Sequence, residues 1–151
     1  MELIRTNSEN DDFRTLIRQL DTDLNIRYGE LQQQYDAHNR VEKLDTAIVA
    51  YIDNAPAGCG CFKQYDDDTA EIKRMFVLPV NRGKGIATRI LGELENWARE
   101  KKYKKTLLET GSKQFEAINM YKKSGYVQTE NFGQYAGNTN SICMKKILIW
   151  D

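Results

Sequence analysis

The passage from a strand to a helix across two glycines constrains the fold of this chain more than any other feature. "AEIKRMFVL" (70–78) predicts a β-strand that ends at Pro79, because proline cannot donate a hydrogen bond to a β-ladder. From Gly83 the hydrophobic residues recur with helical spacing to about Lys102. Glycine costs a helix roughly 1 kcal/mol relative to alanine, so Gly83 and Gly85 indicate a need for bare backbone at its start. The unpaired N–H groups of a helix N-terminus attract anions, and we therefore predict a phosphate-binding loop here.

The other patterns surround this unit with short strands and amphipathic helices. A helix follows Ser8 and Asn10, its candidate caps, while residues 21–44 are weakly patterned and predict one more helix and a loop. The predicted strands are 2–6, 46–53, 59–65, 70–78, 105–110, 126–132 and 141–150, with turns at 54–58 and 66–68 and a helix at 114–123 that stops at Gly125. This order predicts a mixed α/β (α+β) fold, built as a single domain over residues 1–151.

The charge balance and the cysteines limit the partners and the location. Lys and Arg number 22, as do Asp and Glu, so the net charge of zero argues against nucleic acid or an anionic membrane as the main partner. The N-terminus has no hydrophobic signal region and no segment is long enough to span a membrane, which favours a cytoplasmic protein. Cys59 and Cys61 lie on a predicted strand and are interpreted as buried thiols rather than half of a metal site. We expect no metal.

The spacing of the glycines excludes two common phosphate-binding motifs. A Walker A loop would need glycine at position 78, which is Leu78, and a dinucleotide fingerprint would need glycine at position 88, which is Thr88. The residues from Arg82 to Ala87 instead match R-x-x-G-x-A, directly after "FVLP". This stretch resembles the pyrophosphate loop of the GNAT superfamily of acyl-CoA-dependent N-acyltransferases. The alternative is a glycine turn that only caps the helix.

A second motif supports the resemblance. "QFEAINMYKKSGY" (114–126) places Ala117 and Tyr121 one helical turn apart, before Gly125 and Tyr126. By itself the tyrosine could simply pack in the core, but GNAT enzymes commonly carry A-x-x-x-Y-x-x-x-G-[FY] at this place. The resemblance covers roughly residues 46–148 and implies a twisted, mostly antiparallel sheet with helices on both faces. Gln114 departs from the asparagine that the family often carries at this position, which leaves its contact with the cofactor open.

The resemblance also implies a cofactor and roles for particular residues. Acetyl-CoA would be bound with its pyrophosphate on the loop, where Arg82 and Lys84 add positive charge, and Tyr121 would protonate the departing thiolate. Backbone N–H groups at the end of the preceding strand would bind the acyl group. The residues so implied for cofactor binding are Met75, Phe76, Val77, Arg82, Gly83, Lys84, Gly85, Ile86, Ala87, Thr88, Gln114 and Tyr121.

A general base is needed because a primary amine with a pKa of about 10.4 is mostly protonated near neutral pH. Glu71, on the strand before the loop, is the best candidate, with an exposed strand carboxylate as the alternative interpretation. Glu109 is a weaker candidate, and His38 is expected at the surface. Asp66, Asp67 and Asp68 are expected to form a solvated turn.

The predicted function is therefore transfer of an acetyl group from acetyl-CoA to a primary amine of a small molecule or peptide, by direct attack in a ternary complex. A non-catalytic acyl-CoA-binding or regulatory module on the same fold is the alternative. Tyr28, Tyr35, Phe132 and Tyr135 are candidates for lining the acceptor site, and the protein is expected to be a monomer or a homodimer.

Overall fold

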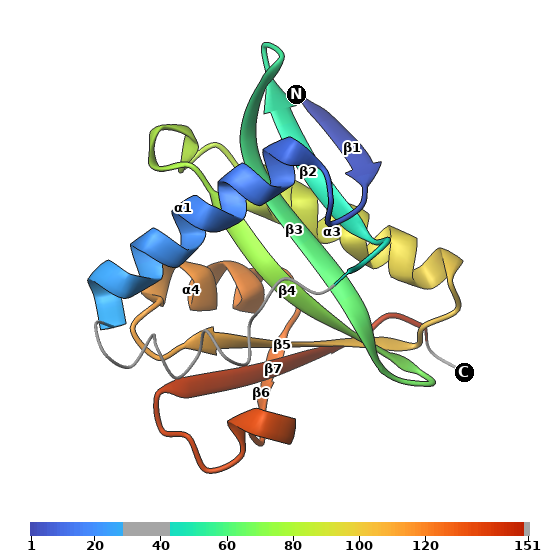
Figure 1. Cartoon of the computed structure of the whole chain (residues 1–151). Coiled ribbons are helices and arrows are strands. Elements are labelled where there is room, and N and C mark those ends of the chain that lie inside the picture. The colour runs from blue at the N-terminus through green and yellow to red at the C-terminus, as the bar shows by residue number, and fades with distance from the viewer. Residues whose placement is uncertain (29–42, 150–151) are drawn as a thin grey trace.

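A single seven-stranded sheet forms the centre of the computed structural model, which describes residues 1–28 and 43–149 (Figure 1). The strand order is β1-β2-β3-β4-β5-β7-β6. Only β4 and β5 run parallel, and every other neighbouring pair is antiparallel. The strands are β1 (Glu2–Thr6), β2 (Ala47–Ile52), β3 (Ala55–Asp66), β4 (Thr69–Val77), β5 (Lys105–Gly111), β6 (Val127–Thr129) and β7 (Ser141–Ile147). The helices are α1 (Asp11–Tyr28), α3 (Ile86–Glu100) and α4 (Phe115–Lys123), with short 3-10 turns at Pro79–Asn81 and Gly133–Tyr135.

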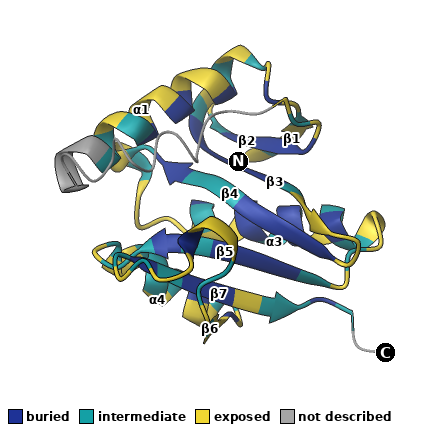
Figure 2. Cartoon of the chain, turned by 60° about the horizontal axis from the view of Figure 1, so that its bottom comes forward, coloured by how far each residue is buried: buried dark blue, intermediate teal, exposed yellow. Residues whose placement is uncertain are grey.

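Helices cover both faces of this sheet, as predicted. Phe13, Leu16 and Ile17 of α1 pack on one face, against side chains of β2, β3 and β4. On the opposite face α3 packs its hydrophobic stripe against the same strands, and α4 joins it there through Tyr121. Figure 2 shows the outcome, with exposed residues along the outer side of α1 and buried residues along much of β5 and β7. The predicted mixed, mostly antiparallel fold is confirmed.

The N-terminal helix differs from the sequence prediction. Asn10 caps it as expected, because its Oδ1 accepts a hydrogen bond of 2.9 Å from the Phe13 N–H. Ser8 is not a cap, since its hydroxyl accepts from the Leu44 N–H at 2.8 Å. α1 continues without a break to Tyr28, and residues 29–42, which make up most of the segment predicted to hold one more helix and a loop, lie outside the described residues. None of the helices in the described part of the chain is long and apolar enough to cross a membrane.

Two strand boundaries were also predicted wrongly. The expected turn at 54–58 shrinks to Asp53 and Asn54, whose φ angles of 50° and 66° fit the tight two-residue hairpin turn, so that β3 begins at Ala55. The expected strand at 126–132 is only three residues long, since the chain leaves the sheet after Thr129. There Asn131 donates from its side chain to the carbonyls of Asn138 and Ser141. Cys59 and Cys61 are buried thiols, as predicted, and their Sγ atoms donate to the carbonyls of Arg74 and Lys73.

The sheet opens where β4 and β5 part. β4 pairs with β5 only from Thr69 to Ile72, so the rest of β4 has no neighbour on that side. A register shift against β3 sets two residues of β4, Arg74 and Met75, opposite Gly60, and Arg74 has a φ of 58°. This is a β-bulge, a feature that bends a strand and re-aims its side chains next to functional sites. The divergence leaves a gap between two central strands, directly before the glycine loop.

Candidate active site

The glycine loop has the backbone geometry that the sequence predicted. Gly83 and Gly85 have φ angles of 79° and 77°, in the left-handed region that other residues rarely adopt. A Cβ atom at either position would meet nothing within 4 Å, so the space above the loop is open. Gly85 is the N-cap of α3, whose first hydrogen bond runs from the Arg89 N–H to the Gly85 carbonyl. The N–H groups of the first turn therefore face this open space without helical partners.

Arg82 holds the loop against the end of β4. Its Nε donates to the Val77 carbonyl at 3.0 Å, and its guanidinium lies 5.7 Å from the centre of the Phe76 ring. Nη2 is 3.9 Å from Oδ2 of Asp23 on α1, an acidic neighbour that the sequence did not predict. Through these contacts Arg82 fixes the loop to β4 and α1, in addition to supplying positive charge. Lys84 is exposed.

A cavity of about 510 Å³ lies between the open end of β4, the loop and the two helices α3 and α4. Every residue predicted for cofactor binding lines it except Lys84. Five further residues line it that the sequence analysis did not select: Asp23, Asn81, Glu116, Ala117 and Met120. Ala117 was within the quoted helix motif and Met120 directly precedes Tyr121, so helical position was the signal that could have found both.

Tyr121 stands at the inner end of this cavity. It is buried on α4, and its ring meets that of Tyr126 edge to face, with 5.8 Å between centroids. Burial raises the pKa of its hydroxyl far above the ordinary value for tyrosine, and the nearby charge of Glu109 raises it further. The hydroxyl therefore keeps its proton near neutral pH and can donate a hydrogen bond to an accepting group.

A second, smaller cavity of about 130 Å³ adjoins the first. It shares four residues with the larger cavity, and these are Met75, Gln114, Ala117 and Tyr121. Its other walls come from α1, β4, β5 and the 3-10 turn that contains Tyr135. The two cavities thus meet at the bulge of β4 and at Tyr121.

Two carboxylates face the smaller cavity, that of Glu71 buried and that of Glu109 half-buried. Glu71 is 4% exposed, so its interpretation as an exposed strand carboxylate is wrong, and the Tyr135 hydroxyl points to its Oε2 at 3.5 Å. Glu109 accepts a hydrogen bond of 2.7 Å from the Ser141 hydroxyl. Burial raises the pKa of Glu109 to about 7, although the hydroxyl of Ser141 and the charge of Lys73 act in the opposite direction. A carboxyl group with this pKa can exchange a proton near neutral pH.

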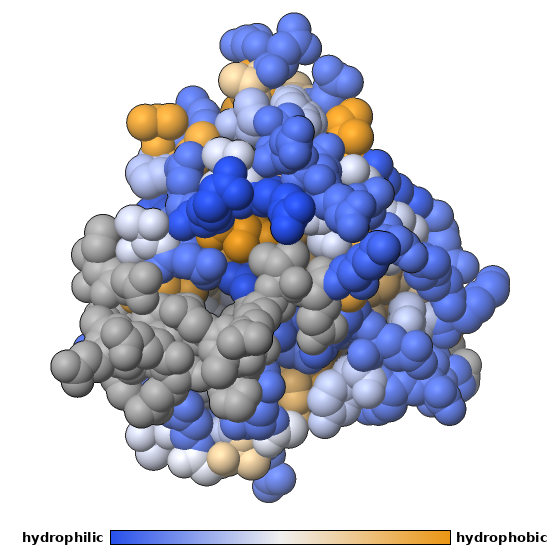
Figure 3. Space-filling view, viewed as in Figure 1, coloured by the Kyte–Doolittle hydropathy of each residue, from blue (hydrophilic) through white to orange (hydrophobic). Residues whose placement is uncertain are grey.

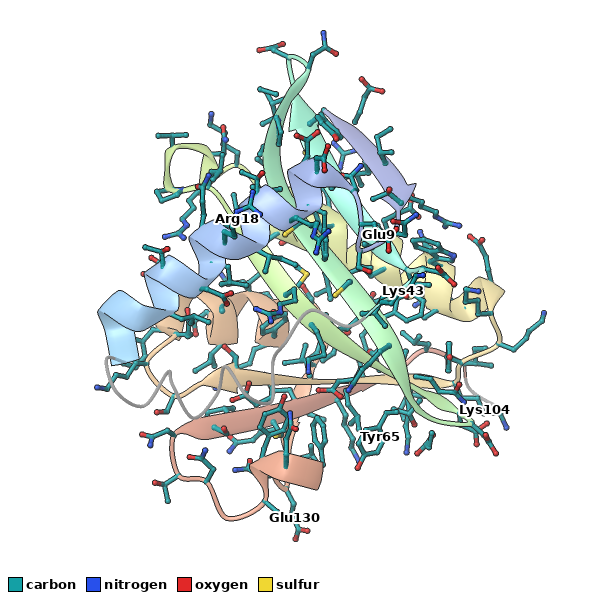
Figure 4. The ribbon with its side chains drawn as sticks, in the orientation of Figure 1. Glu9, Arg18, Lys43, Tyr65, Lys104 and Glu130 are labelled. Atoms are coloured by element: carbon teal, nitrogen blue, oxygen red, sulfur yellow. The ribbon has the colours of Figure 1, made fainter. Side chains whose placement is uncertain are left out.

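Only one of the described residues predicted to line the acceptor site reaches the smaller cavity. Tyr135 lines the smaller cavity, whereas Phe132 packs behind it, with ring centroids 5.5 Å from Tyr135 and 5.2 Å from Tyr65. Figure 4 labels Tyr65 near the end of β3. The side chain of Tyr28, together with Tyr35 and His38, lies outside the described residues. Asp66, Asp67 and Asp68 form an exposed turn, as predicted.

The face of the molecule that carries α1 is mostly hydrophilic where residues are described. Figure 3 shows on it a small hydrophobic area near the centre, with hydrophilic residues along its upper edge. Within residues 1–28 and 43–149 no cluster of histidine, cysteine and acidic residues is arranged to hold a metal ion.

Known proteins are related to this chain in sequence and in fold. The chain is 33% identical over 135 residues to an IAA acetyltransferase of Azospirillum brasilense, a match that covers 88% of each protein. The structure of a Klebsiella pneumoniae protein assigned to the acyl-CoA N-acyltransferases superposes with a TM-score of 0.82 at 24% identity, covering 98% of this chain and 97% of that one. The PaiA N-acetyltransferase of Thermoplasma acidophilum, solved in complex with coenzyme A, gives a TM-score of 0.72 at 18% identity over 97% and 98% of the two chains.

The family model described as the acetyltransferase (GNAT) family matches residues 10–126, which include the glycine loop and Tyr121. This match and the Azospirillum relative together fix the family, while the structural neighbours agree on the fold. The chain therefore belongs to the GNAT family of acetyltransferases.

Proposed function

We propose that this protein transfers an acetyl group from acetyl-CoA to a primary amine of a small molecule or peptide, by direct attack of the amine within a ternary complex. The observation that carries the proposal is the meeting of the two cavities at Tyr121 and the open edge of β4. The larger cavity has the glycine loop, which suits a pyrophosphate. The smaller cavity has the carboxylates of Glu71 and Glu109, which suit an amine.

The larger cavity fits the cofactor because its walls offer donors where acetyl-CoA has acceptors. The N–H groups of the first turn of α3 and the backbone at Gly83 and Gly85 would hold the pyrophosphate. The edge of β4 from Met75 to Val77, which β5 leaves unpaired, would bind the acyl carbonyl and hold it for attack. When bound, acetyl-CoA supplies an activated thioester.

Glu71 and Glu109 are the groups that would remove the proton from the amine. Both lie at the smaller cavity, and Glu71 remains the first candidate because it lies on the same strand as the acyl-binding edge. Glu109 has a pKa of about 7, a value suited to a base or a proton relay at neutral pH. Either group would deliver the neutral amine that attack requires.

Tyr121 would donate its proton toward the thiolate that departs. Its raised pKa holds the proton on the hydroxyl in the resting site, and the hydroxyl would hydrogen-bond to the sulfur and give up its proton as negative charge develops there. A cytoplasmic location is also part of the proposal, and the reduced thiols of Cys59, Cys61 and Cys143 support a reducing compartment.

The test combines cofactor binding with catalysis. Acetyl-CoA should raise the melting temperature in proportion to the logarithm of its concentration above Kd. A thiol-release assay over a panel of primary amines should then find acceptors whose acetylated products are identified by mass spectrometry. Acetyl-CoA binding without release of coenzyme A by any amine would reject the proposed transfer and leave a non-catalytic binding module.

A further inference from the structure

Lys73 lines the smaller cavity and adds a positive charge to the wall that carries Glu71 and Glu109. On β4, Ala70 and Ile72 pack in the core beneath α3, so Glu71 and Lys73 project to the opposite face, toward α1. Both line the smaller cavity together with Glu109 and Tyr135. β4 and β5 pair up to Ile72 and Leu108, which sets Lys73 level with Glu109 at the point where the strands begin to part.

The ammonium of Lys73 is partly removed from water, which disfavours its charged form. Burial lowers its pKa, and the charge of Glu71 acts against that effect. Arg74, the other cationic residue of the cavity wall, is already paired, since its Nη1 lies 2.8 Å from Oδ1 of Asp21. Among the residues that the structure describes, none forms an ion pair with the Lys73 ammonium like the pair of Arg74 with Asp21.

The charges at this cavity select for an acceptor that carries both signs. A simple alkylamine would bring its positive charge next to Lys73, and like charges repel. An acceptor with a carboxylate would pair that group with Lys73 and leave its amine for Glu71 and Glu109. Two residues of one strand face that project alike are about 6.6 Å apart, so neighbouring groups of one small molecule can reach both.

We propose that the acceptor is a small aminocarboxylate, an amino acid or a close analogue, whose free carboxylate is bound by Lys73. This inference rests on the proposed function, because it names the acceptor class for the same site. The cavity volume of about 130 Å³ suits such a molecule, and Leu20 and Leu24 of α1 give one of its walls an apolar lining for a side chain. Lys73 is here a specificity residue, and it takes no part in proton transfer.

The test uses matched trios of acceptors that differ only at the carboxylate. Each trio contains an amino acid, its amide and the amine left when the carboxyl group is removed. Leucine, leucinamide and isoamylamine form one trio, and phenylalanine, phenylalaninamide and phenethylamine form another. The wild-type protein should release coenzyme A faster with the acid of at least one trio, by about 10-fold or more in kcat/KM, because hydrogen bonds to charged groups are among the strong ones.

Lys73→Gln should remove this preference and nothing else. The kcat/KM for the preferred acid should fall about 10- to 100-fold, while those for the amide and the amine stay within about twofold or rise. The KM for acetyl-CoA should not change. Lys145→Gln is the matched control, since Lys145 is an exposed strand lysine of β7 that lines neither cavity, and it should keep the preference for the acid.

The outcomes separate this inference from the proposed function. If amines are acetylated but no acid is preferred, or if Lys73→Gln lowers all members of a trio equally, the acceptor class is wrong and the acetyl transfer stands. If no member of any trio is acetylated, the acceptor class is tested by binding instead, with melting temperatures measured for each acid and amide in the presence of coenzyme A. An acid that stabilises the wild-type protein more than its amide, but not the Lys73→Gln variant, would support the inference, and equal shifts would overturn it.

Discussion

The two cavities that meet at Tyr121 are built in different ways. The larger one is lined mostly by a continuous piece of chain, the end of β4, the glycine loop and the start of α3, where bare backbone at the glycines is open to the cavity. The smaller one is lined by residues of five separate elements, α1, β4, β5, α4 and the turn Gly133–Tyr135, with Glu71, Glu109 and Tyr135 distant in sequence. Backbone recognition tolerates changes of side chain and suits a cofactor that many related enzymes share. Recognition by side chains can change with single substitutions, which suits an acceptor that differs between relatives.

Tyr121→Phe tests the boundary between the cavities and should have the largest effect. Because the proton donor is lost while the ring remains, kcat should fall about 100-fold or more. The Kd for acetyl-CoA, measured by calorimetry, should stay within about twofold. An unchanged kcat would reduce Tyr121 to a packing residue.

Glu71→Gln tests the acceptor side alone. The kcat/KM for the amine should fall about 100-fold at pH 7, because the base is lost. The deficit should shrink at higher pH, where more of the amine is already neutral. Asp67→Asn, in the exposed turn before β4, removes a carboxylate without touching either cavity and should have no effect. A deficit independent of pH would argue against the assignment of Glu71 as the base.

Gly85→Asp tests the cofactor side alone. A side chain at a φ of 77° is strained, and its negative charge would face the pyrophosphate, so acetyl-CoA should bind about 10- to 100-fold more weakly. Gly137→Asp is the matched control, because Gly137 has a φ of 78° with equally open space around it, and it lies outside both cavities. Equal affinities of the two variants for acetyl-CoA would mean that the loop does not hold the cofactor.

Glu109→Gln should change the pH dependence of stability. Burial raises the pKa of Glu109 from 4.5 to about 7 in the folded protein, so folding favours the protonated form. The contribution of this group to stability is therefore complete below pH 4.5 and is lost as the pH rises through 7. Glutamine has no such proton, and the variant should melt about 3 °C or more above the wild type at pH 8 but not at pH 4.5. Parallel melting curves of the two proteins across this range would contradict the burial of an ionisable Glu109.

Phe132→Ala should have the smallest effect and should be felt only on the acceptor side. Phe132 contacts Tyr135 and Tyr65 edge to face, and each aromatic pair contributes about 0.5–1.5 kcal/mol. Looser packing of Tyr135 should raise the KM for the acceptor about 3- to 10-fold, with the KM for acetyl-CoA unchanged. Phe115→Ala, at the exposed start of α4 and outside both cavities, is the control. A rise in the KM for acetyl-CoA would show that the two sites are not separate.

The larger cavity could be predicted from the sequence because its determinants are local. The determinants lie within a few residues of one another, namely the strand end at Pro79, the glycines at 83 and 85 and the helical period from Ile86. Glycine in such a place indicates a backbone with positive φ, which the loop has. The tyrosine of α4 was found by a motif with fixed helical spacing. Of the residues so predicted, only Lys84 does not line the cavity.

The acceptor cavity could be predicted only in part. Glu71 and Tyr135 were selected, and Glu109 was selected as a weaker candidate for the base. Nothing in the sequence around Lys73 or Glu109 indicates that these side chains are withdrawn from solvent. Their burial depends on which face of the sheet α1 covers and on the pairing of β5 with both β4 and β7. The bulge at Arg74 and Met75 was likewise not predicted, because a positive φ at arginine has no signal in the sequence.

The family, the class of fold and the loop that would hold the cofactor could thus be predicted from the sequence, since each depends on patterns among residues close together in the chain. The exposure of Glu71 and Glu109, the point where β4 and β5 part, and the cavity that these carboxylates share with Lys73 follow from the tertiary structure. The charge state of a side chain depends on its solvent exposure and on neighbours brought close by strand pairing. Those neighbours come from distant parts of the chain.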